Sequence, residues 1–319
     1  MKKRLVCLLA ALVLLVCFVS CGSDGGGEDG KLKIIAANFP GYDLARAVTG
    51  DLAEVSLLLP PGTESHSYEP TPRDILDVQS CDLFIYLGGE SDAWVDTILK
   101  SLDKPVNTLR MIDCVPTLEE EPLEGMEEIH DDHDDHGHGH GQVLEVDEHV
   151  WTSPVNAMQI VEHICAEIVK LDETNAETYA ANANGYLTEL LALDSEIRAY
   201  VDSVSDPVMV FGDRFPLRYF AEAYGITCYA AFPGCSTQTE PSAATIAYLT
   251  DLVREKGLGT VYYIEFSNHL VADSIAEATG AKTALFHSCH NVSKQELDSG
   301  VTYLSLMRGN LETLKETMK

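Results

Sequence analysis

Residues 174–204 read TNAETYAANANGYLTELLALDSEIRAYVDSV and predict one long helix. Its apolar side chains recur at helical spacing: Tyr179, Ala183, Tyr186, Leu190, Leu193, Ile197 and Val201. A helix of about 30 residues would be on the order of 45 Å long, which is more than one small lobe needs. We therefore expect a stiff connector between two lobes.

A second helix is expected directly before the long one. Ser153 and Pro154 form a helix start, with proline at the first helical position. Apolar residues then recur at helical spacing as far as Leu171, and Asp172 ends the helix. The two helices together define a helical connector over residues 153–205.

Strands and helices alternate before the connector. The strands are expected near 31–37, 54–59, 82–87 and 106–111. The helices are expected near 40–49, 72–80 and 91–101. Thr71, Pro72 and Asp74 form a capping box at the start of the second of these helices.

The plan repeats after the connector. Strands are expected near 207–211, 227–232, 260–265 and 282–286. Helices are expected near 216–224, 242–256, 269–279 and 302–317. Alternation of this kind predicts a parallel sheet covered by helices. The expected fold class is α/β, with two parallel-sheet (βα)4 lobes at 31–152 and 206–319.

The first residues predict export. Lys2, Lys3 and Arg4 precede an apolar stretch that is too short for a comfortable membrane span, which is typical of a secretory signal over residues 1–20. The segment FVSC at 18–21 resembles a bacterial lipobox, in which Cys21 would carry the lipid. Residues 21–30 would then be a flexible tether. The alternative is ordinary secretion with cleavage nearby.

Charge excludes several classes of partner. The formal net charge is −30, and removal of residues 1–20 would bring it to about −33. So acidic a chain is a poor partner for nucleic acid or anionic lipid. The composition fits an extracytoplasmic protein, and the resemblance to a lipobox implies a lipid anchor at the outer face of the cell membrane. We expect a monomer.

Residues 130–141 read HDDHDDHGHGHG and interrupt a long acidic loop over 115–147. This run has no apolar residue to bury, so it cannot form a core. Imidazole and carboxylate together are ligands for divalent transition metals. The loop predicts auxiliary metal capture by a mobile segment, through His130, His133, His136, His138 and His140. The alternative is a solvated acidic loop.

Isolated histidines suggest a separate, fixed site. His66, Asp213 and His287 each follow a predicted strand, and His149 precedes the helix start at Ser153. Ligands collect beyond the carboxyl ends of strands in open α/β sheets. Three imidazoles and one carboxylate would form a closed four-ligand set suited to zinc, between the two lobes.

Other residues near these positions carry alternatives. His290 could join or replace His287, and Glu265 could be a ligand or an acceptor that orients an imidazole. We expect His163 and His269 to be exposed.

Cysteine usage is compatible with an oxidising compartment. If Cys21 is lipidated, six mature cysteines remain. Cys235 and Cys289 both follow strands of the second lobe, and a disulfide between them is the leading interpretation. Free thiols come next, and a thiolate metal ligand comes last. Cys165 is expected to be a packed thiol.

The pattern resembles the zinc- and manganese-specific solute-binding lipoproteins of ABC importers over nearly the whole mature chain. Besides the His-rich loop and the long helix, it is carried by PPGTESHSYEPTPRD (60–74), DEHVWTSP (147–154), AYGI (223–226), TEPS (239–242), YIEFSN (263–268) and TYLSLMRGNLETL (302–314).

The resemblance implies two α/β lobes joined by a rigid helix, with one metal held between them. His66 and His149 fall on the two histidine positions of the first lobe. The third family ligand precedes a Tyr-Phe pair, which makes Asp213 the candidate, and His287 stands where the fourth ligand is usually Asp.

Three classes of function are compared on this basis. The first is a non-catalytic receptor that captures Zn²⁺ and passes it to a membrane permease, with Mn²⁺ as the alternative metal. The second is an extracytoplasmic metalloenzyme, against which no HExxH or GxSxG signature is present. The third is an adhesin. The donor set is rich in nitrogen and therefore favours zinc over manganese.

Overall fold

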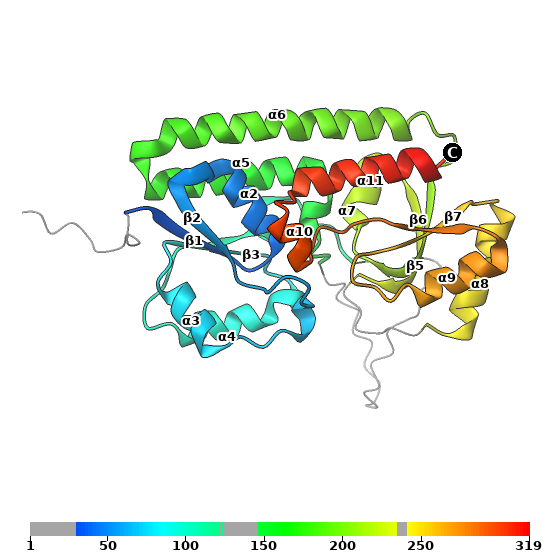
Figure 1. Ribbon diagram of the computed structural model, residues 1–319, viewed down its shortest axis with the longest axis horizontal. Helices are drawn as coiled ribbons and strands as arrows, with labels where there is room; N and C mark the ends of the chain where they lie inside the picture. The colour runs from blue at the N-terminus through cyan, green and yellow to red at the C-terminus, as the bar shows by residue number, and fades with distance from the viewer. Residues whose placement is uncertain (1–29, 121–122, 124–145, 235–240) are drawn as a thin grey trace, which may run out of the picture.

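The computed structural model describes residues 30–120, 123, 146–234 and 241–319. Each of its two lobes is built on a four-stranded parallel sheet covered by helices (Figure 1). The predicted fold class is therefore confirmed. Among the described residues, none of the helices has the length and hydropathy that a membrane span requires.

The first lobe has the strand order β2-β1-β3-β4. Its strands are β1 (Leu32–Ala36), β2 (Ala53–Leu57), β3 (Leu83–Tyr86) and β4 (Thr108–Arg110). Its helices are α2 (Phe39–Thr49), α3 (Pro72–Gln79) and α4 (Ala93–Ser101). The short 3-10 helices of the chain are η1 (Gly50–Leu52), η2 (Ser65–Ser67), η3 (Glu90–Asp92), η4 (Met111–Cys114), η5 (Val150–Thr152) and η6 (Glu173–Asn175).

The second lobe repeats this strand order as β6-β5-β7-β8. Its strands are β5 (Val208–Phe215), β6 (Thr227–Pro233), β7 (Thr260–Tyr263) and β8 (Lys282–Leu285). Its helices are α7 (Arg218–Tyr224), α8 (Ala243–Glu255), α9 (Leu270–Thr279), α10 (Lys294–Asp298) and α11 (Tyr303–Thr317). Helix α10, which has five residues, was not predicted from the sequence.

The connector consists of α5 (Pro154–Leu171) and α6 (Ala176–Val201), which pack against each other. Helix α6 runs along both lobes (Figure 1). Asn182 donates to Val48 O in the first lobe at 3.0 Å, whereas Asp194 accepts from Tyr224 Oη in the second lobe at 3.0 Å. The long helix thus fixes the two lobes side by side, as the sequence predicted.

Three local expectations can be compared with the structure. The capping box of Thr71 and Asp74 is present. Ser153 is the N-cap residue of α5, but its side chain makes no capping hydrogen bond. The expectation that Asp213 follows its strand is wrong, because β5 continues to Phe215 after a register shift between Phe211 and Arg214.

A buried carboxylate in the first lobe makes the stability of the protein depend on pH. Asp92 accepts hydrogen bonds from Leu87 N at 2.5 Å and Gly88 N at 3.3 Å. Burial, together with nearby Glu148, nevertheless raises the pKa of Asp92 to about 7. The folded protein therefore binds an extra proton between about pH 4 and pH 7, so this group lowers stability as pH rises through that range.

Replacement of Asp92 with Asn should reduce this dependence on pH. Between pH 5 and pH 8 the free energy of unfolding of the wild type should fall more than that of Asp92→Asn, by at least about 1 kcal/mol. Urea unfolding at the two pH values measures the difference. Asp96→Asn, a change at an exposed residue of α4, is the control. Equal pH dependence in both variants would contradict the assignment to Asp92.

Candidate metal centre

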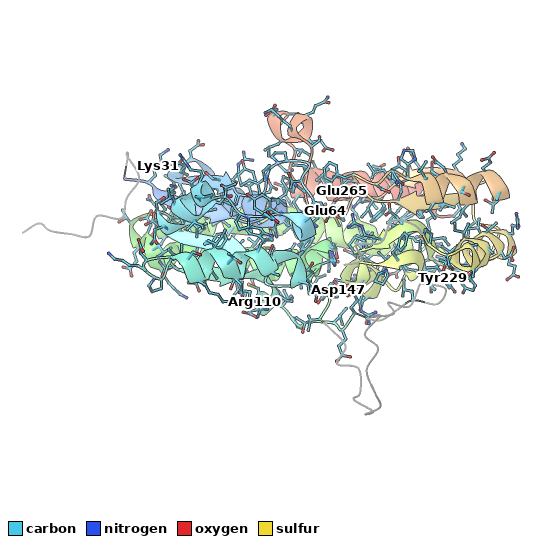
Figure 2. All side chains as sticks on the ribbon, turned by 90° about the horizontal axis from the view of Figure 1, so that it is seen from below. Lys31, Glu64, Arg110, Asp147, Tyr229 and Glu265 are labelled. Carbon is cyan, nitrogen blue, oxygen red and sulfur yellow. The ribbon has the colours of Figure 1, made fainter. Side chains whose placement is uncertain are left out.

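A pocket of about 30 Å³ lies where the two lobes meet. Its lining residues come from both lobes: Thr63, Glu64, Ser65, His149, Arg214, Pro216, Gly234, Ile264, Glu265, Phe266, Ser288, His290 and Asn291. Two of them, Glu64 and Glu265, are labelled near the junction of the lobes in Figure 2. A volume of this size suits an ion or a water molecule, and it is far below that of a typical organic ligand site.

His149 directly precedes η5 and lines the pocket from the first lobe. Its side chain is 2% exposed, and its Nδ1 donates to Asp147 Oδ1 at 3.0 Å. The backbone N of His149 donates to the same oxygen at 2.8 Å. Because a carboxylate fixes Nδ1 as the protonated nitrogen, Nε2 keeps its lone pair for a metal.

The electrostatic environment of His149 has two opposing parts. Burial lowers the pKa of His149, but Asp147 and Glu148 outweigh burial and leave the pKa above its ordinary value. A bound cation would therefore replace a proton at an imidazole that lies in a negative environment.

Gly234 allows the close packing of the His149 ring, since a Cβ at Gly234 would lie 3.0 Å from His149 Cε1.

His290 enters the pocket from the second lobe. Its Nε2 lies 3.2 Å from Ser65 Oγ of the first lobe. The centroids of the His149 and His290 rings are 6.2 Å apart. Burial, together with the neighbouring His149, lowers the pKa of His290 to about 4. His290 is therefore neutral at pH 7, which is the form that binds metal.

Glu265 holds the loop that carries His290. Its carboxylate accepts from Ser288 N at 2.8 Å, from Ser288 Oγ at 2.6 Å and from His290 N at 3.3 Å. These bonds are made to Ser288 and to the backbone of His290, and not to the His290 ring. Glu265 also lines the pocket, and its role as a ligand or as an orienting acceptor stays a prediction.

The loop over residues 60–65 is tied to the second lobe beside the pocket. Asn291 Nδ2 donates to Pro60 O at 3.0 Å and to Thr63 O at 2.9 Å. Arg214 Nη2 donates to Glu64 Oε2 at 3.0 Å. These contacts of Asn291, Glu64 and Arg214 were not predicted, because contacts between residues about 150 or more positions apart leave no local signal in the sequence.

The Asp213 carboxylate accepts hydrogen bonds within the second lobe. Its Oδ1 accepts from Arg214 N at 2.8 Å and its Oδ2 accepts from Ile264 N at 3.2 Å. Burial raises the pKa of Asp213. Asp213 is thus not among the described residues that line the pocket with His149, and coordination by Asp213 stays a prediction.

His287 is also absent from the described lining of the pocket. Its Nδ1 accepts from Cys289 N at 2.9 Å and lies 3.6 Å from Glu265 Oε1. Its Nε2 is buried without a hydrogen-bond partner. Coordination by His287 likewise stays a prediction.

His66 lies within η2, beside the pocket-lining residues Glu64 and Ser65. Its side chain is outside what the structure describes. Within the described side chains, no group of three His, Cys, Asp or Glu residues lies in metal-binding geometry. His163 and His269 are exposed, as expected.

Several predictions fall on residues that the structure does not describe. They concern lipidation at Cys21, the cysteine at position 235, and the loop histidines His130, His133, His136, His138 and His140. Cys289 is a buried free thiol, whose pKa burial raises well above its ordinary value. Its pairing with Cys235 stays a prediction.

Comparison with known proteins finds a family and several relatives. A family described as "Zinc-uptake complex component A periplasmic" matches residues 34–317. Zinc-binding lipoprotein AdcA of Streptococcus pneumoniae is 34% identical over 318 residues, which are 99% of this chain and 61% of the relative. The chain thus spans less than two thirds of the length of AdcA. High-affinity zinc uptake system protein ZnuA of Bacillus subtilis is 33% identical, over 97% of this chain and 96% of the relative.

A solved structure agrees with these sequence matches. The Zn(II)-bound ZnuA-like domain of Streptococcus pneumoniae AdcA superposes with a TM-score of 0.73 at 30% identity. The match covers 91% of this chain and 99% of that domain.

Proposed function

The chain belongs to the family of zinc-uptake complex component A proteins, and from this premise we propose that it is an extracytoplasmic zinc receptor of an ABC importer. It captures Zn²⁺ between its two lobes and delivers the ion to a membrane permease. One observation carries the proposal: His149 and His290 reach the same ion-sized pocket from opposite lobes.

The donor set supports zinc as the cargo. His149 and His290 line the pocket, and we add His66 because it follows the lining residues Glu64 and Ser65. Three imidazoles suit zinc, whereas manganese prefers oxygen ligands. Glu265 also lines the pocket, and its carboxylate would be the fourth ligand that closes the set. We propose that His290, rather than Asp213 or His287, completes the imidazole set.

The proposed role is binding and release without catalysis. A catalytic zinc keeps one position open for water or substrate, and a receptor encloses its ion in protein ligands. The pocket of about 30 Å³ leaves little space beside a bound ion. We further propose that Cys21 carries a lipid that anchors the protein at the outer face of the cell membrane.

Metal analysis of protein purified without added metal tests the function. We expect about one tightly bound zinc per chain, and competition should favour zinc over manganese. Protein that takes up manganese in preference to zinc would contradict the zinc assignment. Protein that binds neither metal tightly would contradict the receptor function.

The His-rich run has a separate role in capture at low metal. Deletion of residues 130–141 should preserve one tight zinc site and remove several weak ones, because a glycine-containing acidic run cannot pre-organise its ligands. Calorimetric titration with zinc resolves the two classes of site. A deletion variant that loses the tight site would show that this run supplies a primary ligand.

A further inference from the structure

Trp151 packs against both imidazoles that line the pocket. It is in η5, fully buried, and its ring centroid is 5.4 Å from that of His149 and 5.3 Å from that of His290. The indole plane is tilted by 55° to the His149 ring and by 42° to the His290 ring. One rigid side chain thus contacts both candidate ligands.

Hydrogen bonds tie Trp151 to the second lobe through both its indole and its backbone. Nε1 of Trp151 donates to Ser288 O at 2.8 Å, two residues before His290 in the second lobe. The carbonyl oxygen of Trp151 accepts from Tyr303 Oη at 2.7 Å. Tyr303 N in turn donates to Asp43 Oδ2 at 2.7 Å, so this chain of contacts ends on helix α2 of the first lobe. The position of the indole is therefore coupled to the relative placement of the lobes.

Trp94, the other tryptophan of the chain, illustrates a role in packing alone. Trp94 packs edge-on against Tyr68 at a centroid distance of 4.9 Å in the first lobe. Its Nε1 has no hydrogen-bond partner, and it is absent from the described lining of the pocket. Trp94 is thus a matched control for Trp151 in this chain.

We infer that Trp151 is a positioning residue, which sets the separation and tilt of His149 and His290 and so determines the geometry of the bound metal. The inference deepens the proposed function and rests on it. Zinc needs nitrogen ligands near 2.0 Å in a tetrahedral arrangement, so shifts of about 0.5 Å at an imidazole matter. Phe at position 151 keeps an aromatic ring but leaves Ser288 O without its donor.

The test uses the full chain with Trp94→Phe and Trp151→Phe. Zinc affinity is measured by competition with a chromophoric chelator, and Co²⁺ replaces zinc so that its absorption spectrum reports coordination geometry. Trp151→Phe should lower zinc affinity about tenfold or more and shift the Co²⁺ bands. Trp94→Phe should leave affinity and spectrum unchanged, and its remaining indole emission should change when zinc binds.

A second variant covers the case in which Trp151→Phe does not fold. Tyr303→Phe removes only the hydroxyl that holds the Trp151 carbonyl, so we expect a smaller shift of the Co²⁺ bands in the same direction. The inference is overturned if folded Trp151→Phe has the affinity and spectrum of the wild type. It is also overturned if Tyr303→Phe leaves the Co²⁺ bands unchanged, or if zinc does not change the indole emission of Trp94→Phe.

Failure of this inference differs from failure of the proposed function. A wild type that binds zinc tightly, beside a Trp151→Phe variant that binds it equally well, overturns only the positioning role. A wild type and Trp94→Phe that both fail to bind zinc overturn the receptor function itself.

Discussion

Replacement of His149 with Ala will lower zinc affinity by about 100-fold or more, the largest effect expected of any single change in this chain. Loss of a residue that only supports a ligand costs about 10- to 100-fold in metal affinity, and loss of a ligand should cost at least as much. His149 is the pocket imidazole whose tautomer is fixed, by Asp147 at 3.0 Å. Titration against a competing chelator measures the loss.

The control for His149→Ala is His163→Ala, which removes an exposed imidazole from α5. Zinc should raise the thermal unfolding temperature of the control as it does for the wild type, because the ion binds only the folded site. The same addition should raise it much less in His149→Ala. Equal zinc affinity in both variants would remove His149 from the site.

Replacement of His290 with Ala should weaken zinc binding far more than replacement of Asp213 with Asn. We expect a loss of about 100-fold for His290→Ala, since its ring lines the pocket and its lowered pKa keeps it neutral. Asp213→Asn should leave affinity nearly unchanged, because the Asp213 carboxylate accepts hydrogen bonds from Arg214 N and Ile264 N within the second lobe.

The two variants separate the two ligand sets in one experiment, with chelator competition as the measurement. His287→Ala, a change at the remaining candidate, completes the series. The reverse order, in which Asp213→Asn and His287→Ala abolish tight binding and His290→Ala does not, would restore the ligand set implied by the family resemblance.

The fold was predicted almost completely because its signals are local. Apolar periodicity, helix starts and glycines after helices lie within a few residues of the elements that they define. Helix α10 was missed because five residues carry no periodicity, although Ser293 and Glu296 form a capping box. The end of β5 was missed because its register shift depends on pairing with β6.

The candidate site was predicted less completely because it depends on how loops turn. The loop after β8 turns at Cys289, whose φ of 62° lies in the left-handed region that non-glycine residues rarely adopt. His290 follows this turn and lines the pocket, whereas His287 precedes the turn and its Nδ1 accepts a hydrogen bond from Cys289 N. A sequence pattern places both histidines near the strand end and cannot distinguish them.

The central claim is that one zinc ion lies between the lobes, and a crystal structure of the zinc-loaded full chain tests it most directly. Anomalous scattering at the zinc edge locates the ion without reference to the protein. The claim predicts one strong peak in the pocket, about 2.0 to 2.1 Å from an imidazole nitrogen of His149 and of His290. A fully occupied zinc elsewhere, with this pocket empty, would contradict it.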